Sequence, residues 1–238
     1  MPPLHVFELR NYTLRSGQRD VLIDLFEREF VESQDTLGAY VLGTFRNADD
    51  PERFVWLRGF ETMETRRAAL EAFYFGPVWQ AHRNTANATM VDSDNVLLLR
   101  PHSGSLTRDA SARPPIGAAP PESTFVATTY FLALRDEEAF ASFFTRDVAP
   151  YLAETGAALV ASLTTEHSAN TFPQLPVREN ETLFVSLARF ESAEAHAAHL
   201  RALEAWSAWR RVAETIARRT RAPTETLRLQ PTARSLLR

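Results

Sequence analysis

The sequence predicts an α+β fold built from two similar halves, and three observations carry that prediction. In the first part of each half, equivalent residues recur 118 positions apart: Tyr12 and Tyr130, Phe26 and Phe144, Gly38 and Gly156. Later in each half the spacing is 130: Phe60 and Phe190, Glu61 and Glu191, Trp79 and Trp209, Leu99 and Leu229. Between the halves, residues 101–121 hold five of the 14 prolines. A repeat of this length indicates two copies of one structural unit.

The change of spacing, from 118 to 130, places an insertion of 12 residues in the second half. It falls between Gly156 and Phe190, where residues 168–176 have the composition of a long loop. We therefore expect a first domain over residues 1–101, a proline-rich linker over 102–121, and a second domain over 122–238 with a short C-terminal tail.

Each half has the pattern strand, helix, strand, strand, helix, strand. In the first half we expect strands over residues 4–14, 39–46, 53–61 and 96–99, from their content of strand-forming residues. The first helix carries an apolar stripe from Val21 to Phe30, with Ser16 as its cap and Gly38 at its end.

Thr62 and Ser192 stand where the second helix of each half needs an N-terminal cap. Gly76-Pro77 predicts that this helix breaks and restarts in the first half, because proline suits a first helical turn. The second half has Trp206-Ser207 instead, and we expect its helix to run straight through. Its last strand is expected over residues 226–229.

A βαββαβ half is a ferredoxin-like unit, a four-stranded antiparallel sheet with helices on one face. The other face is apolar and costly to expose. Two such units in one chain can cover these faces with each other. We therefore predict a pseudo-dimeric α/β barrel within the single chain, with homo-oligomers forming through its outer surfaces.

Composition excludes several classes of protein. The 238 residues carry a net charge of −4, which disfavours nucleic acid binding. No apolar run is long enough for a membrane span, and the first residues lack signal-peptide features, so we expect a cytoplasmic protein. Cys and Lys are both absent, which excludes disulfides, thiolate metal sites and Schiff bases. With eight glycines, phosphate-binding loops are excluded too, and we expect no cofactor.

Three motifs of the first half carry a resemblance to a known family. Glu8-Leu9-Arg10-Asn11-Tyr12 resembles the opening motif of the NIPSNAP family. Residues 54–61, with Trp56 and a final Phe-Glu, and the segment Gly76-Pro77-Val78-Trp79 are similar to two further motifs of that family. The second half follows by the repeat, although Ala127-Thr128-Thr129 replaces Glu-Leu-Arg and Ser186 replaces Trp56.

The resemblance implies the dimeric α/β barrel superfamily. That superfamily includes cofactor-free monooxygenases, chlorite-dismutase-like haem proteins and isomerase-like enzymes, while NIPSNAP proteins are mostly without an assigned reaction. The implied fold agrees with the repeat argument, but fold alone says little about function.

One candidate site lies on the first strand, where Glu8, Arg10 and Tyr12 alternate on one face. Arg10 could bind an anionic group through its planar fork, and Tyr12 could hydrogen-bond a substrate. The alternative is a structural ion pair, which we favour for Glu8. The second half lacks the matching acid and base, so such a site is expected in the first half.

A second candidate group combines Trp56, Trp79 and His82. Trp79 and His82 are three residues apart and therefore neighbours on one helix. His82 could move a proton near neutral pH, with both tryptophans as walls. The alternative is that the tryptophans are core residues and His82 covers a helix face.

His196 and His199 also lie three residues apart, and a metal site would need a third ligand such as Glu166 or His167. The Ala-rich surroundings favour a solvated helix face instead, and we predict no metal.

Two functions follow from the sequence. The first is binding of a small apolar or aromatic ligand by Arg10, Trp56 and Trp79. If the protein is an enzyme, the family resemblance implies cofactor-free monooxygenase-like or isomerase-like chemistry, with His82 and Tyr12 as catalytic residues. The alternative is a non-catalytic adaptor or structural protein that binds other proteins.

Overall fold

The computed structural model describes all residues except 1, 105 and 107. The first half contains β1 (Val6–Leu14), α1 (Arg19–Leu25), a π-helical turn (Phe26–Phe30), α2 (Val31–Asp35), β2 (Tyr40–Asn47), β3 (Arg53–Phe60), α3 (Met63–Tyr74), α4 (Pro77–Thr89), β4 (Met90–Asp92) and β5 (Val96–Gly104). A short 3-10 turn (Ala110–Ala112) follows in the connecting segment.

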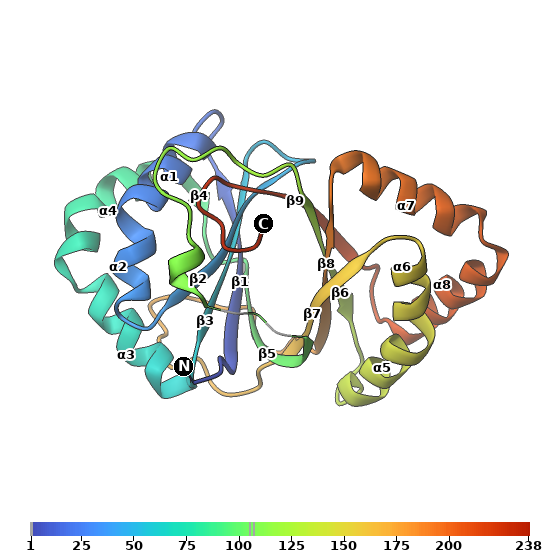
Figure 1. Ribbon diagram of the computed structural model, residues 1–238. Helices are drawn as coiled ribbons and strands as arrows, with labels where there is room; N and C mark the ends of the chain where they lie inside the picture. Colours follow the sequence, from blue (N-terminus) through green and yellow to red (C-terminus); the bar gives the residue numbers. More distant parts are fainter. Residues whose placement is uncertain (1, 105, 107) are drawn as a thin grey trace.

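The second half contains β6 (Thr124–Phe131), α5 (Glu137–Phe143), a π-helical turn (Phe144–Val148), α6 (Ala149–Glu154), β7 (Ala158–Thr165), β8 (Leu183–Phe190), α7 (Ala193–Ala205), α8 (Ser207–Arg219) and β9 (Glu225–Pro231). Figure 1 shows the strands at the centre of the molecule, with α1 to α4 on one side and α5 to α8 on the other.

The strands form a closed antiparallel barrel. They follow the order β3-β2-β9-β6-β8-β7-β5-β1, and β1 pairs with β3 to close the ring, while β4 extends it beside the end of β1. The seam between the halves consists of two strand pairs, β2 with β9 and β5 with β7. The predicted α/β barrel is therefore confirmed.

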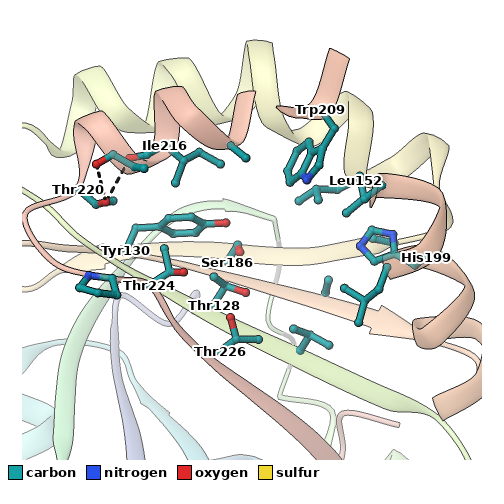
Figure 2. A pocket seen from close by; sticks show the side chains of 18 of the residues that line it. Thr128, Tyr130, Leu152, Ser186, His199, Trp209, Ile216, Thr220, Thr224 and Thr226 are labelled. Atoms are coloured by element: carbon teal, nitrogen blue, oxygen red, sulfur yellow. Dashed lines mark hydrogen bonds between the residues drawn. The ribbon is translucent and has the colours of Figure 1, made fainter. Parts of the chain in front are cut away.

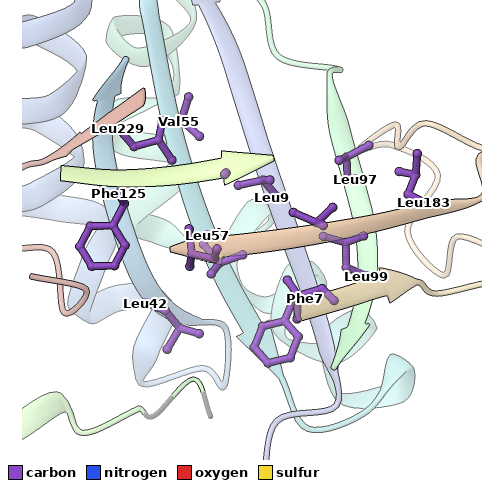
Figure 3. Close-up of a cluster of buried hydrophobic side chains, with 14 of the residues drawn as sticks. Phe7, Leu9, Leu42, Val55, Leu57, Leu97, Leu99, Phe125, Leu183 and Leu229 are labelled. Carbon is purple, nitrogen blue, oxygen red and sulfur yellow. The ribbon is translucent and has the colours of Figure 1, made fainter. Parts of the chain in front are cut away.

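The interior of the barrel is a packed apolar core. Figure 3 shows the side chains that fill it, among them Phe7 and Leu9 from β1, Leu57 from β3, Phe125 from β6 and Leu229 from β9. These side chains come from strands of both halves and alternate with residues that face the helices. The inside of the barrel is thus occupied by side chains.

The strand pairing of the two halves has the same register. Val6 lies opposite Phe60 in the first half, and Thr124 lies opposite Phe190 in the second. The β-bulges recur as well, at residues 41–43 and 159–161, and so do the π-helical turns that begin at Phe26 and Phe144. All of these pairs keep the spacings of 118 and 130 found in the sequence.

Most helix signals act as predicted. The hydroxyl oxygens of Thr62 and Ser192 accept hydrogen bonds from the backbone N–H groups of Thr65 and Ala195, which confirms both caps. Pro77 begins α4, as expected from Gly76-Pro77.

Two expectations about the helices are wrong. Ser16 does not cap α1, because the chain makes a turn there and the helix begins only at Arg19. The second helix of the second half does not run through: it breaks into α7 and α8 at Trp206, whose φ of −89° and ψ of 106° are extended. The break lies at the same place as in the first half, although Ser207 stands where the first half has Pro77. Trp206 packs on Tyr151 with ring centroids 4.6 Å apart.

The insertion of the second half reaches across to the first half. It forms most of the loop between β7 and β8, and Phe172 in this loop stacks on Tyr74 with ring centroids 5.8 Å apart. β5 runs on to Gly104, beyond the predicted end of the strand at residue 99.

None of the helices among the described residues has both the length and the hydropathy that a membrane span needs.

We expect Gly104→Ala to destabilise the seam between β5 and β7. Gly104 has a φ of +82°, and an added Cβ would lie 2.3 Å from the carbonyl oxygen of Val160. Gly17→Ala is the matched control, because its φ is +73° but nothing lies within 4 Å of the added Cβ.

Both variants should lose about 1 kcal/mol from the positive φ. Gly104→Ala should lose about 1–3 kcal/mol more, from the overpacking. Urea denaturation measures the free energies of unfolding. Equal losses would show that the seam relaxes around the new methyl group.

Candidate functional site

The largest cavity of the second half lies between the outer face of the barrel and helices α6, α7 and α8. Its volume is about 710 Å³. β6, β8 and β9 form its floor, and Figure 2 shows Trp209, Ile216, Leu152 and His199 around the space above Tyr130 and Ser186. We call it the second-half cavity.

The floor of this cavity consists of small side chains. Val126 and Thr128 lie on β6, where they pair with Ala188 and Ser186 of β8. The first half has large side chains at the equivalent positions: Glu8, Arg10, Arg58 and Trp56. The two halves therefore share one strand register, but large side chains fill this volume in the first half and small side chains leave it open in the second.

The hydroxyl groups of the second-half cavity lie on its floor. Burial raises the pKa of Tyr130 to about 12, and its hydrogen bond with Ser186 opposes this shift. The phenol therefore stays protonated at neutral pH. Thr128 and Thr226, paired across β6 and β9, add two further hydroxyls beside it (Figure 2). These groups can donate hydrogen bonds to, and accept them from, a polar atom of a ligand.

Two histidines lie at one end of the cavity. His196 and His199 are 5% and 6% exposed, so the expected solvated helix face is wrong. Their rings stack with centroids 6.2 Å apart, and Phe190 packs against both at 4.9 Å. The Nδ1 atom of His199 lies 2.8 Å from the Thr155 hydroxyl. Burial lowers the pKa of each imidazole, which favours the neutral form.

These histidines have no further metal ligand beside them. Among the described residues, no group of three His, Asp or Glu side chains comes close enough to hold a metal ion. The interactions that the structure shows for them are the contact of His199 with Thr155 and the packing of both rings on Phe190.

In the first half, the candidate strand motif forms a buried ion cluster. The Glu8 carboxylate accepts hydrogen bonds from Arg10 Nη1 at 2.7 Å, Arg58 Nε at 2.8 Å and Arg66 Nε at 2.6 Å. All four side chains have zero exposure. This is the structural ion-pair alternative favoured for Glu8, extended by two arginines from β3 and α3.

The cluster has three guanidinium groups for one carboxylate. Burial alone would raise the pKa of the Glu8 carboxyl, but the charges of Arg58, Arg10 and Arg66 together hold it well below its usual range. The remaining partners are neutral: Gln34, Asn170 and Thr171 accept hydrogen bonds from Arg58 and Arg66. Asn170 and Thr171 belong to the inserted loop, so the second half closes over this cluster.

Beside the cluster lies a smaller cavity, of about 400 Å³, which we call the first-half cavity. Its lining comes from β1, α3, α4, the β4–β5 turn and the inserted loop: Tyr12, Tyr74, Phe75, Trp79, Gln80, Arg83, Asn87, Met90, Ser93, Phe172, Gln174 and Leu175. Tyr12 and Trp79 match Tyr130 and Trp209, which line the second-half cavity. The two cavities therefore correspond at the end beside Tyr12 and Tyr130, while the remaining part of the second-half cavity is filled by side chains in the first half.

The structure brings four of the five predicted site residues together. Tyr12 and Trp79 line the first-half cavity. Arg10 lies behind Tyr12 and donates from Nε to its hydroxyl at 2.9 Å. Trp56, 2% exposed, packs edge-on against Tyr12 at 5.9 Å and belongs to the core rather than to the cavity lining.

His82 lies apart from this group. Its Nε2 atom is 3.6 Å from a carboxylate oxygen of Glu29, and its ring packs against Phe30 at 6.2 Å. It lines neither of the two cavities, because it projects from α4 towards the first helix of this half. The geometry therefore gives His82 no contact with a ligand in either place.

The sequence analysis did not identify the floor of the second-half cavity as a site. The signal was the replacement of Arg10 and Trp56 by Thr128 and Ser186. We took this as the loss of a site, because the charged motif was absent. The strand registers correct the alignment expected from the sequence by one residue, because Val126-Ala127-Thr128 stands in place of Glu8-Leu9-Arg10. The cavity could have been predicted from side-chain volume, because a small residue on a strand that faces the helices leaves space between them.

We expect Glu8→Gln to destabilise the protein strongly, because it leaves three buried guanidinium groups without a counter-charge. Breaking a buried ion pair by removing one partner costs about 3–5 kcal/mol. Glu71→Gln is the matched control: it removes an exposed carboxylate paired with Arg67, worth less than about 1 kcal/mol. Denaturant titration at neutral pH measures both, and similar small losses would show that the cluster does not depend on Glu8.

The free energy of unfolding should also fall between about pH 7 and pH 5, because the two buried histidines take up protons on unfolding, where their pKa returns to about 6.5. Because the pKa of each histidine is lowered in the folded state, stability is lost as the pH falls below the pKa of the unfolded state. His196→Gln with His199→Gln should flatten the dependence, while His5→Gln, at an exposed position, should not. An unchanged slope in the double variant would contradict this assignment.

Comparisons with known proteins agree with this fold. The NIPSNAP family model matches residues 7–105. A candidate monooxygenase of Fusobacterium nucleatum is 10% identical, with a TM-score of 0.61 over 97% of this chain and 94% of that one. An anthrone oxidase-like protein is 12% identical, with a TM-score of 0.60 over 98% and 94%. No curated protein matches the chain by sequence.

A NIPSNAP-like domain protein of Burkholderia xenovorans matches 43% of this chain and 91% of its own, at 26% identity and a TM-score of 0.40. The two longer matches show a shared fold over nearly the whole chain. The family match begins within β1 and extends just past the end of β5, where the first half ends. The first half of this chain is therefore similar to the NIPSNAP family over residues 7–105, and the second half lies outside that match.

Proposed function

We propose that this protein binds a small, neutral, apolar or aromatic molecule in the second-half cavity. The observation that carries the proposal is an open volume of about 710 Å³ at the place where the first half is filled by Arg10, Trp56 and Arg58. A large cavity with apolar walls and a few convergent polar groups is the usual form of a small-molecule site.

The lining determines the chemistry of the ligand. Leu152, Leu203, Trp209 and Ile216 provide apolar walls, and the hydroxyls of the floor provide hydrogen bonds. Arg221, at the edge, is the one permanently charged lining residue, and it pairs with Glu181. A ligand with a net charge would lose its hydration here without a free counter-charge, so a neutral ring system with a carbonyl or hydroxyl group fits best.

His196 and His199 add the capacity to accept a proton. A neutral imidazole can remove a proton from a carbon next to a carbonyl group, and this step begins both isomerisation and cofactor-free oxygenation. These are the two reaction types that the sequence suggested. The anthrone oxidase-like structural neighbour suggests tricyclic ketones as first ligands to test.

We also infer that the two halves are ferredoxin-like units derived from one duplicated domain, with boundaries at 1–101 and 122–238. The strand orders β2-β3-β1-β5 and β7-β8-β6-β9, with the same registers and the same bulges, support this inference. On this view the second unit diverged by gaining a cavity, while the first retained the NIPSNAP motif.

The test is thermal unfolding with anthraquinone and 2-naphthol as ligands. At one hundred times Kd a ligand stabilises the folded state by about 2.7 kcal/mol, which raises Tm. Ser186→Trp should remove the shift, because its indole would take the place of Trp56 between Tyr130 and Phe144, the counterparts of Tyr12 and Phe26. Ala213→Trp should do the same from α8.

Leu134→Trp, at a side chain 77% exposed and outside the cavity lining, controls for the added indole and should keep the shift. Persistence of the shift in both filled variants would place the ligand elsewhere. No shift with either ligand, in a folded protein, would contradict the proposal and favour the adaptor alternative.

A further inference from the structure

We propose that the first-half cavity is a second ligand site, that it takes an anionic aromatic molecule of the aryl carboxylate class, and that Arg10 acts on the anion through Tyr12. This inference does not depend on the function proposed for the second-half cavity, because a different set of residues carries it.

The first observation is uncompensated buried charge. Arg10, Arg58 and Arg66 have one carboxylate, Glu8, among them, and all four side chains are excluded from water. The Nη2 atom of Arg66 has no hydrogen-bond partner among the described residues. Positive charge in a low-dielectric region attracts an anion more strongly than the same charge in water. An anion next to this cluster would therefore be bound more tightly than a neutral molecule of the same shape.

The second observation is the route from the cluster to the cavity. The Tyr12 hydroxyl accepts a hydrogen bond from Arg10 Nε, and no described residue accepts the proton of that hydroxyl. Burial raises the pKa of Tyr12 to about 12, against the lowering effect of Arg10, so the proton is retained. Tyr12 lines the first-half cavity with 5% of its surface exposed, and the proposal places a ligand oxygen against its O–H there. Arg10 is thus a positioning residue, and Tyr12 makes the contact.

A backbone carbonyl group also links Arg10 to the first-half cavity. Arg10 Nη2 lies 3.5 Å from the carbonyl oxygen of Ser93, which lines the inner part of the first-half cavity. Asp92 and Asp94 flank Ser93, but both are exposed, so water and salt screen their charges. Arg83, on α4, adds a positive charge at the rim.

The third observation is the aromatic lining. Tyr74 stacks on Phe172 with an interplanar angle of 23° and meets Trp79 edge-on at 4.9 Å. The amides of Gln80, Asn87 and Gln174 lie on the exposed side. Flat aromatic walls with a positive, hydrogen-bonding inner end match a planar molecule that carries a carboxylate at one end.

The site requires both halves of the chain. Phe172, Gln174 and Leu175 come from the inserted loop of the second half, which also supplies the partners of Arg66. The second-half cavity has no arginine behind its tyrosine, because Thr128 stands in place of Arg10. The two cavities should therefore select ligands by charge, the first an anion and the second a neutral molecule.

The test is isothermal titration of the full chain with 2-naphthoate and with 2-naphthamide, its neutral counterpart of the same shape. The comparison is made in Ala217→Trp, whose second-half cavity is filled and cannot take the amide; there we expect the acid to bind at least tenfold more tightly than the amide. Tyr12→Phe should weaken 2-naphthoate about tenfold or more, as expected for a lost hydrogen bond to a charged group. Tyr130→Phe is the matched control and should leave that affinity unchanged.

Asn87→Trp fills the first-half cavity from an exposed position on α4, so it serves even if Tyr12→Phe is poorly folded. It should abolish 2-naphthoate binding. Its counterpart Ala217→Trp, on α8 at the second-half cavity, should not. Equal affinity for acid and amide, loss of binding in Ala217→Trp rather than Asn87→Trp, or no binding of 2-naphthoate at millimolar concentration would each overturn the proposal. None of these outcomes bears on binding of anthraquinone in the other cavity.

Discussion

Closure of the barrel is the constraint on which the rest of this structure depends. Each half contributes four strands with one apolar face, and neither face could remain in water. The two seams, β2 with β9 and β5 with β7, place Phe45 opposite Pro231 and Pro101 opposite Leu163. Once the inner faces are packed together, every helix must lie outside (Figure 1). The two cavities described above lie in the space between these helices and the strands.

That outer space is used differently in the two halves, although the backbone is nearly the same. In the first half, Arg10, Trp56 and Arg58 fill it and Glu8 holds the guanidinium groups together. In the second half, small residues leave it open. A buried ion cluster gains little stability over an apolar core, because desolvation offsets the Coulombic attraction. The ion cluster is therefore better explained by the proposed anion site, beside which it holds positive charge, than by stabilisation of the fold.

The inserted loop of the second half packs against the first half. Residues 166–182 leave β7, cover the ion cluster through Asn170 and Thr171, and place Phe172 against Tyr74. The first half has a short turn in the corresponding place and gives no such cover to the second-half cavity. Because only the second half has this loop, the first-half cavity is lined by residues of both halves, and the second-half cavity by residues of the second half alone.

Periodicity and local hydrogen bonding were enough to predict the main strands, the spacings of 118 and 130, and the caps at Thr62 and Ser192, but not the helix break at Trp206. The sequence also predicted Arg10, Tyr12 and Trp79 as candidate site residues, and the structure brings these three together. Only the tertiary structure decided that Glu8 would meet three arginines, that His82 would face Glu29, and that Thr128 and Ser186 would border empty space. Alternation along a strand tells which face a side chain takes, but partners and empty volume depend on segments far away in the chain.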